Sequence, residues 1–207
     1  MDGVLLLSLP VHVKSFREVL RKINIHDFDY SRYAGMRTDE CLEAVLREKG
    51  ISFSREELDE LAREKKALSN RYFQRSLPLH PNAREVIKKL AGRFTLALAT
   101  SASEANMNLF LYRSGCAKFF SCIVNGKEVK HAKPAPDIYL KVAESLSFSP
   151  GQALVVEDSI NGIKAATSAG MHCVGIHGPS PRQEMLDLGV INVLSSIDEL
   201  PPLLEVE

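Results

Sequence analysis

The spacing of hydrophobic residues changes near residue 77. Before that point, from His12 onward, apolar side chains recur three and four positions apart. The positions that show this spacing are Val13, Phe16, Val19, Leu20, Ile23, Cys41, Leu42, Val45 and Leu46. The pattern places them on one face of successive helices and predicts a small all-helical lobe over residues 12–77. Ser54 followed by Glu57 is a capping-box signature, and the charged run 56–66 is typical of a solvated helix face.

After Pro78 and Pro81, short apolar runs alternate with helical patterns. Strands are predicted at 95–99, 122–124, 153–156, 172–176 and 190–193. Helices are predicted at about 82–90, 105–114, 136–146 and 162–169. Strands separated by single helices favour right-handed crossovers and a parallel sheet. The sequence therefore predicts an α/β fold, in which residues 1–11 begin the core, 12–77 form the helical lobe and 78–207 complete the core.

Composition and charge narrow the class of partner. The 207 residues are 45% hydrophobic and 25% charged, which is ordinary for a globular protein. Lys plus Arg and Asp plus Glu number 26 each, so no overall field attracts nucleic acid or an anionic membrane surface. We therefore expect a small-molecule partner, with no nucleic acid and no membrane, and a monomer.

Cysteine usage and the first apolar run bear on the compartment. Four cysteines are scattered without any Cys-x-x-Cys pair, which favours reduced, mostly buried thiols over a zinc site or a disulfide framework. The apolar run 4–9 is too short to cross a bilayer and lacks the basic region of a signal peptide. A cytoplasmic protein is the expectation.

Two adjacent carboxylates follow one of the predicted strands. The apolar run 153–156 leads directly into Glu157 and Asp158, and a helix follows. Open parallel sheets bind ligands at the carboxyl ends of their strands, and neighbouring acids repel each other unless a cation lies between them. A hard divalent cation with oxygen ligands, typically Mg²⁺ beside a phosphate, is the natural occupant.

Two further loops should meet these acids at the same edge of the sheet. Thr100 and Ser101 follow the strand 95–99, and Lys133 precedes the helix 136–146. Thr100 and the backbone N–H groups after it can donate hydrogen bonds to a phosphate, while Lys133 supplies a positive charge. Each signal is weak by itself, because a threonine at a strand end is most often a local turn and a lone lysine is most often solvated. It is the ordered set that predicts a phosphate site.

Three segments in this order resemble those of a known family. They are Leu96-Ala97-Leu98-Ala99-Thr100-Ser101, Lys133-Pro134-Ala135-Pro136-Asp137, and Val155-Val156-Glu157-Asp158-Ser159 with Asn161-Gly162-Ile163. They are similar to motifs two, three and four of the haloacid dehalogenase (HAD) superfamily, in its branch of β-phosphoglucomutase and sugar-phosphate phosphatases. The similarity covers residues 78–177, and Asp2-Gly3 with the helical lobe extends it to nearly the whole chain. It implies a HAD-type, Rossmann-like parallel sheet core and a small helical cap domain that closes over the site.

The resemblance also implies a reaction. In the family, an aspartate on the first strand attacks phosphorus to form an aspartyl-phosphate, and a second aspartate two residues later is the general acid and base. Asp2 matches that second position, with its backbone carbonyl on Mg²⁺. The resemblance also assigns phosphate binding to Thr100 with Gly3, Ser101 and Ala102, and contact with the nucleophile and the phosphate to Lys133. It assigns Mg²⁺ binding to Glu157 and Asp158, and it makes His12 a hinge histidine. For His12, local contacts at a helix start are an equally good interpretation.

The chain departs from the family pattern at its front. The pattern is an apolar strand followed by Asp-x-Asp-Gly-Val, whereas this sequence reads Met1-Asp2-Gly3-Val4, so the nucleophile position falls before Met1. Leu7 stands where relatives commonly carry an acid. Three explanations remain open: a misassigned start, which we favour, a truncated non-catalytic relative, or an omitted beginning. As given, the chain is expected to leave the neighbours of the missing strand unpaired and to form no aspartyl-phosphate.

Residues of the cap would choose the substrate. Candidates are Arg37 and Thr38, and the stretch 65–71 with Lys65 and Lys66, although solvated helix charges fit the same pattern. β-Phosphoglucomutase-like enzymes hold a second phosphate with a cap arginine; counting from Gly35 puts Thr38 at that position and Arg37 one residue early. This favours a phosphatase acting on a small phosphorylated metabolite, a sugar phosphate, over a phosphomutase. A non-catalytic relative that only binds a ligand or a partner is the alternative from another class.

Overall fold

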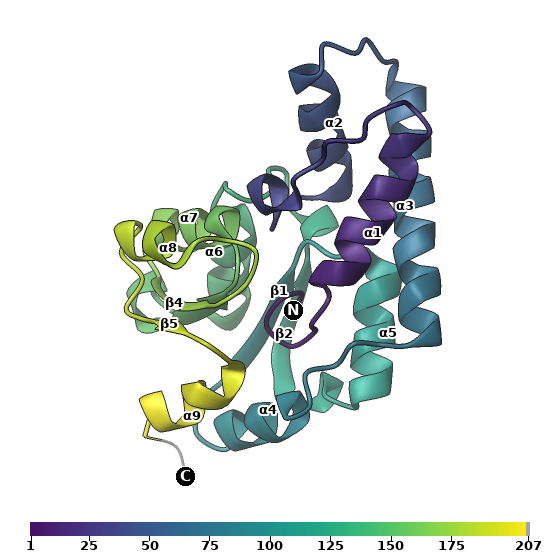
Figure 1. Cartoon of the computed structure of the whole chain (residues 1–207). Helices are drawn as coiled ribbons and strands as arrows, with labels where there is room; N and C mark the ends of the chain where they lie inside the picture. The colour runs from purple at the N-terminus through teal and green to yellow at the C-terminus, as the bar shows by residue number, and fades with distance from the viewer. Residues whose placement is uncertain (206–207) are drawn as a thin grey trace.

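The computed structural model describes residues 1–205 and begins with a group of helices (Figure 1). These are α1 (Leu9–Arg21), the short 3-10 helix η1 (Tyr30–Tyr33), α2 (Thr38–Glu48) and α3 (Arg55–Arg75). Helices α1 and α2 both pack on α3 around buried apolar side chains such as Phe16, Leu42 and Leu58. Helix α1 begins earlier than the predicted start at residue 12, because Pro10 suits a first helical turn, where its missing N–H is not needed.

The predicted capping box is present at the start of α3. Ser54 Oγ accepts a hydrogen bond from the Glu57 N–H at 3.2 Å, and Glu57 Oε2 accepts one from the Ser54 N–H at 2.7 Å. The expectation of a solvated face along this helix holds only in part. Lys65 and Ser69 are buried, because this side of α3 faces α1 and the α/β core rather than water.

The second part of the chain alternates helices with strands, as predicted. In chain order its principal elements are α4 (Ala83–Ala91), β1 (Leu96–Thr100), α5 (Glu104–Ser114), β2 (Phe120–Asn125), α6 (Asp137–Leu146), β3 (Leu154–Glu157), α7 (Ile160–Ser168), β4 (His172–Ile176), α8 (Arg182–Asp187), β5 (Val193–Leu194) and α9 (Leu200–Leu203). Short 3-10 helices η2 (Ala117–Phe119), η3 (Gly126–Glu128), η4 (Pro150–Gln152) and η5 (Ile197–Glu199) connect them. The helices cover the strands, which gives the α/β architecture.

The prediction was wrong in detail near the end of the chain. The strand expected at 190–193 is confined to Val193–Leu194, and the helix α8 was not predicted. Ile191 is 60% exposed, and the Asn192 side chain accepts a hydrogen bond from the Val193 N–H at 2.8 Å. The Val193 N–H is thus bonded to the side chain of its neighbour where the strand begins.

All strand pairs are parallel, but the strands form two separate sheets. One sheet pairs β1 with β2, and the other has the order β3-β4-β5. Among the described residues no ladder joins β1 to β3, so each of these strands is paired on one side only, which matches the expectation of unpaired neighbours. Ala97 of β1 is exposed and Val155 and Val156 of β3 are half-buried, although strands of parallel sheets are ordinarily buried on both faces.

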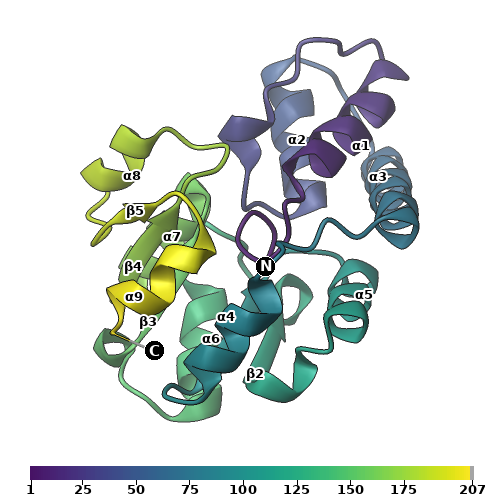
Figure 2. The same cartoon turned by 60° about the horizontal axis from the view of Figure 1, so that its bottom comes forward.

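The N-terminal residues form a tight loop between the cap helices and the two sheets (Figures 1 and 2). The Met1 carbonyl accepts hydrogen bonds from the N–H groups of Leu5 at 2.8 Å and Leu6 at 3.1 Å. The Leu5 carbonyl in turn accepts one from the His80 N–H at 2.9 Å. These bonds tie the loop to the segment that enters α4, and so hold Asp2 at the carboxyl ends of the strands.

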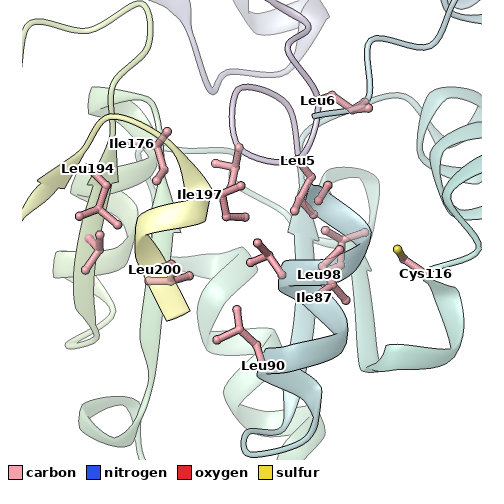
Figure 3. Packing of buried hydrophobic residues seen from close by; sticks show 14 of the residues in the cluster. Leu5, Leu6, Ile87, Leu90, Leu98, Cys116, Ile176, Leu194, Ile197 and Leu200 are labelled. Atoms are coloured by element: carbon pink, nitrogen blue, oxygen red, sulfur yellow. The ribbon is translucent and has the colours of Figure 1, made fainter. Parts of the chain in front are cut away.

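Side chains, rather than backbone hydrogen bonds, fill the space between the two sheets. Figure 3 shows Leu5 and Ile197 lying between Leu98 of β1 and Leu194 of β5, and all four belong to one buried cluster. The cysteines are free thiols, three of them buried and Cys122 half-buried, as the sequence predicts. Within residues 1–205, no helix is both long and apolar enough to span a bilayer.

Candidate active site

A small cavity of about 70 Å³ lies where the N-terminal loop, the cap helices and the strand ends meet. It brings together most of the residues singled out in the sequence: Asp2, Gly3, His12, Thr38, Lys65, Lys66, Thr100, Ser101, Ala102, Lys133, Glu157 and Asp158. Arg37 does not line it and faces a second cavity instead. The sequence candidates therefore converge on one site, with Arg37 outside it.

The strand ends and the helices after them aim hydrogen-bond donors at this cavity. Thr100 is the last residue of β1, and its Oγ1 accepts from the Ala102 N–H at 3.2 Å. Ser103 caps α5 by accepting from the Asn106 N–H, and Ser159 caps α7 by accepting from the Gly162 N–H. Two helices thus begin beside the site, and the positive end of a helix dipole favours an anion.

Glu157 is held by the protein on both carboxylate oxygens. Its Oε1 accepts hydrogen bonds from Lys133 Nζ and from Tyr139 Oη, the latter at 2.7 Å. Its Oε2 accepts from Ser159 Oγ at 3.0 Å. Burial raises the pKa of the Glu157 carboxyl, but the charge and hydrogen bond of Lys133 outweigh it, so the pKa lies below its usual value. Glu157 is therefore ionised.

Asp158 lies beside Glu157 in a different environment. Its carboxylate lies against the backbone of Gly3, where a Cβ would collide with it, and Gly3 has a φ of 67°. Burial, together with the charge of Glu157, raises the pKa of Asp158 above its usual value. A half-buried carboxylate beside a second carboxylate is a site where a cation is stabilised.

Mg²⁺ was inferred from the sequence, and the donors in the cavity can be tested against it. Within residues 1–205 no group of three or more His, Cys, Asp or Glu side chains is arranged to hold a metal. Asp158 and the backbone of Asp2 offer hard oxygen donors of the kind Mg²⁺ takes. Glu157 is committed to Lys133, Tyr139 and Ser159 instead. Of the residues inferred from the sequence to bind Mg²⁺, Asp158 and Asp2 are therefore those whose oxygens are not committed to Lys133.

A buried hydrogen-bonded chain links the acid/base candidate to the cap. His12 Nε2 lies 3.0 Å from Asp2 Oδ1, and Lys65 Nζ lies 3.1 Å from His12 Nδ1. A lysine ammonium can only donate, so His12 Nδ1 accepts and the hydrogen on Nε2 points at Asp2. Burial and the charge of Lys65 lower the pKa of His12, which agrees with a neutral ring.

The chain also lowers the pKa of Asp2. Burial alone would raise it, but the electrostatic effect of the neighbouring His12, followed by its hydrogen bond, brings the pKa below the usual value. Asp2 is therefore an ionised carboxylate at neutral pH whose hydrogen-bond partner belongs to the first cap helix.

Three further hydrogen bonds fasten the segment 34–37 of the cap over the site. Ser101 Oγ donates to the Gly35 carbonyl at 2.9 Å, and Asn161 Nδ2 donates to the Ala34 carbonyl at 2.8 Å. Arg37 Nη1 donates to the Gly126 carbonyl at 3.3 Å. Ser101 and Gly126 directly follow β1 and β2, and Asn161 lies in the first turn of α7 after β3, so the segment 34–37 is held against the carboxyl ends of three strands.

Sequence reasoning missed the partners that hold the predicted residues in place. Tyr139 binds Glu157 from the first turn of α6, where an aromatic residue at helical spacing looks like ordinary core. Lys65 was considered only as a possible contact to the far end of a substrate. A signal for its burial was available, because Lys65 lies at helical spacing from Leu58, Ala62 and Phe73 on the buried face of α3.

The chain is similar to known phosphatases over most of its length. The sequence profile of haloacid dehalogenase-like hydrolases matches residues 1–176. A phosphorylated carbohydrates phosphatase of Thermotoga maritima is 32% identical over 212 residues, which cover 100% of this chain and 96% of that protein. The fructose-1-phosphate phosphatase YqaB of Escherichia coli is 33% identical over 180 residues, which cover 85% of this chain and 93% of that protein.

Solved structures agree with this similarity. A hydrolase from Pseudomonas syringae superposes with a TM-score of 0.88 at 25% identity, covering 99% of this chain and 95% of that one. A variant of CbbY from Rhodobacter sphaeroides, crystallised in complex with xylulose-(1,5)bisphosphate, superposes with a TM-score of 0.82 at 25% identity, covering 97% and 93%.

Proposed function

Because the chain belongs to the haloacid dehalogenase-like hydrolase family, we propose that it is a phosphatase of small phosphorylated carbohydrates. The observation that carries this proposal is the convergence of Thr100, Lys133 and Asp158 in one small cavity beside Asp2. Two relatives that match most of the chain are named as phosphatases of phosphorylated carbohydrates and of fructose 1-phosphate, which supports the substrate class.

The cavity suits the phosphate end of such a substrate. Lys133 is only 5% exposed and lies within hydrogen-bond distance of Glu157, so its ammonium group is held in one place. Thr100 is 4% exposed, and the N–H groups of Ser101 and Ala102 begin the turn into α5. Fixed donors in a site shielded from water stabilise negative charge on phosphoryl oxygens more strongly than solvated donors do.

Asp2 is placed to move a proton to the leaving group. His12 holds its carboxylate, and the ring of His12 is held by Lys65 from the cap. A carboxylate that accepts one proton and later returns it can serve as general acid and base in successive half-reactions. Because Lys65 lies on α3 and Asp2 in the core loop, this arrangement exists only when the cap is closed.

Bound Mg²⁺ would neutralise charge on the transferring phosphoryl group. Asp158 and the Asp2 backbone are the residues we propose to hold it. Glu157 acts through Lys133, since it fixes the position of the ammonium group.

Transfer to a carboxylate needs a further acid beside Asp2. Of the three carboxylates that line the cavity in the described structure, Asp2 is assigned to proton transfer, Asp158 to the cation and Glu157 to Lys133. We therefore propose that residues 1–207 by themselves bind substrate but form no aspartyl-phosphate.

The test is release of phosphate from a panel of sugar phosphates in the presence of Mg²⁺. It compares residues 1–207 with the same chain carrying a short apolar strand that ends in aspartate before Met1. Release by the extended chain alone, abolished by EDTA and by Asp2→Asn, is the expected result. No release by either form contradicts the phosphatase proposal, and a trapped phosphoenzyme on residues 1–207 contradicts the proposal that this chain alone is inactive.

A further inference from the structure

The hydroxyl group of Tyr30 has no hydrogen-bond partner in the described part of the chain. Three of the five tyrosines, Tyr33, Tyr72 and Tyr139, each donate to a glutamate. Tyr112 is 85% exposed and can bond to water. Tyr30 is half-buried and lines the active-site cavity of about 70 Å³, yet its hydroxyl bonds to no residue within 1–205. It is therefore a donor that the described protein does not use.

This hydroxyl opens into the active-site cavity. Within residues 1–205, Arg37 Nε is the one side-chain nitrogen or oxygen that is both shut off from solvent and without a partner. The Tyr30 hydroxyl also lacks a partner, so it must be in contact with open space. Burial raises the pKa of this hydroxyl more than any other influence does, so the open space is the cavity that Tyr30 lines and not bulk solvent.

The ring that carries the hydroxyl is fixed in place. Tyr30 is the first residue of η1, which Asp29 caps by accepting a hydrogen bond from the Ser31 N–H at 3.0 Å. The ring stacks on that of His12, with centroids 6.0 Å apart and planes at 22°, and it packs on Phe16 with centroids 5.6 Å apart. A donor that is held in this way loses little conformational freedom when it binds a ligand.

The hydroxyl stays protonated and lies on the side of the leaving group. Burial raises the pKa of Tyr30 well above its usual value, and the negative charges of Asp2 and Asp158 raise it further, so the group can donate at neutral pH. His12, on which the ring stacks, also holds Asp2, the residue proposed to move a proton to the leaving group. The donors proposed for the phosphate belong to the core instead.

A neutral hydroxyl group fits this position better than a further anion. The charges of Asp2 and Asp158 oppose an anion beside them. A carbohydrate hydroxyl can accept a hydrogen bond from Tyr30 and donate its own hydrogen to a carboxylate, which an ionised phosphate oxygen cannot do. Because the cavity is small, the hydroxyl that reaches this position is one close to the phosphate.

We propose that Tyr30 donates a hydrogen bond to the carbohydrate hydroxyl nearest the phosphate, and so selects sugar phosphates over the phosphates of simple alcohols. The inference rests on the proposed function and deepens it by naming a residue that determines specificity. A ligand without this hydroxyl leaves the Tyr30 donor unpaired in the closed cavity, and such a donor costs binding free energy.

The experiment compares a ligand that has the hydroxyl with one that lacks it. Fructose 1-phosphate and ethyl phosphate are titrated into residues 1–207 by calorimetry, in Mg²⁺ and a phosphate-free buffer. We expect Tyr30→Phe, which keeps the ring on His12, to weaken fructose 1-phosphate binding about three- to tenfold. The affinity for ethyl phosphate should change by less than about twofold, because that ligand offers no hydroxyl to lose.

Tyr72→Phe is the matched control. Tyr72 is also a half-buried tyrosine of the cap, but it lies outside the cavity and donates to Glu18 at 2.6 Å. The control should leave both affinities unchanged, and thermal melts should show that both variants are folded.

The inference is overturned by unchanged fructose 1-phosphate binding in Tyr30→Phe, or by no binding of this ligand to the unchanged chain. An equal loss for both ligands, or the same loss in Tyr72→Phe, would also overturn it, because either result indicates a purely structural effect. The proposed function fails separately, if the extended chain binds fructose 1-phosphate and releases no phosphate from any sugar phosphate of the panel.

Discussion

Lys65 shows how much a single buried charge can matter. Its side chain is almost out of water at 4% exposure, between His12 and the ring of Phe16, and burial lowers the pKa of Lys65 to about 8 from 10.5. Below pH 8 the folded protein must hold a buried charge, and this penalty fades as the pH rises from 8 to 10.5. We expect Lys65→Met to raise the free energy of unfolding by about 1–3 kcal/mol at pH 7 and by much less at pH 10. Urea unfolding at the two pH values measures it, and an equal gain at both would refute the explanation.

The cysteines give a second test at the scale of residues. Burial raises the pKa of the Cys41 and Cys173 thiols to about 12, and Cys116 is fully buried. Cys122 alone among the four is half-buried rather than buried. We expect one thiol of the native protein to react readily with a disulfide reagent, and Cys122→Ser to remove that reaction. Fast reaction of a second thiol in the variant would show that the fold is looser than described.

Among individual residues, the sequence identified the site residues that lie at the end of a strand. Thr100 and Glu157 could be placed because a parallel sheet brings the carboxyl ends of its strands together. Lys65 was missed because the charged run 56–66 was interpreted as one solvated face, although Lys65 shares helical spacing with the buried Leu58 and Ala62.

At the scale of elements, the capping box of α3 can be measured directly. Ser54→Ala removes the side-chain acceptor for the Glu57 N–H and should lower the free energy of unfolding by about 1 kcal/mol. Ser145→Ala is the control, since Ser145 is an exposed serine within α6 that bonds only to the Lys141 carbonyl. The control should change stability by less than about 0.5 kcal/mol, and an equal loss in both variants would argue against the cap.

The boundaries of elements were predictable to the extent that local signals are strong. The strands at 95–99 and 172–176 were expected and lie at β1 and β4 with little or no shift. The short strand β5 was placed too early: Val190 and Ile191 are apolar, but Ile191 is 60% exposed and the Val193 N–H bonds to the Asn192 side chain. A side-chain hydrogen bond of this kind overrides the apolar pattern.

At the scale of the molecule, the division into two sheets is the feature that individual strand patterns cannot show. Strand β4 is paired on both sides, whereas β1 and β3 are each paired on one. Parallel strands bond to each neighbour through alternate residues, so part of the backbone of β1 and β3 has no ladder partner. We expect amide hydrogens of β4 to exchange more slowly than those of β1, measured on peptides spanning 172–176 and 96–100. Equal protection would mean that the sheets are joined in solution.

The strength of the contact between these two sheets should depend on temperature. Leu5, Leu98, Leu194 and Ile197 hold the two halves together through apolar contact, which weakens on cooling, whereas each half is internally bonded through its backbone. On cooling, the contact between the two sheets should therefore weaken before the hydrogen bonds within each sheet do. The NMR signals of the Leu5 and Ile197 methyl groups should broaden near 0 °C before those of Val174 within β4. Cold would then destabilise the protein at its centre rather than at its surface.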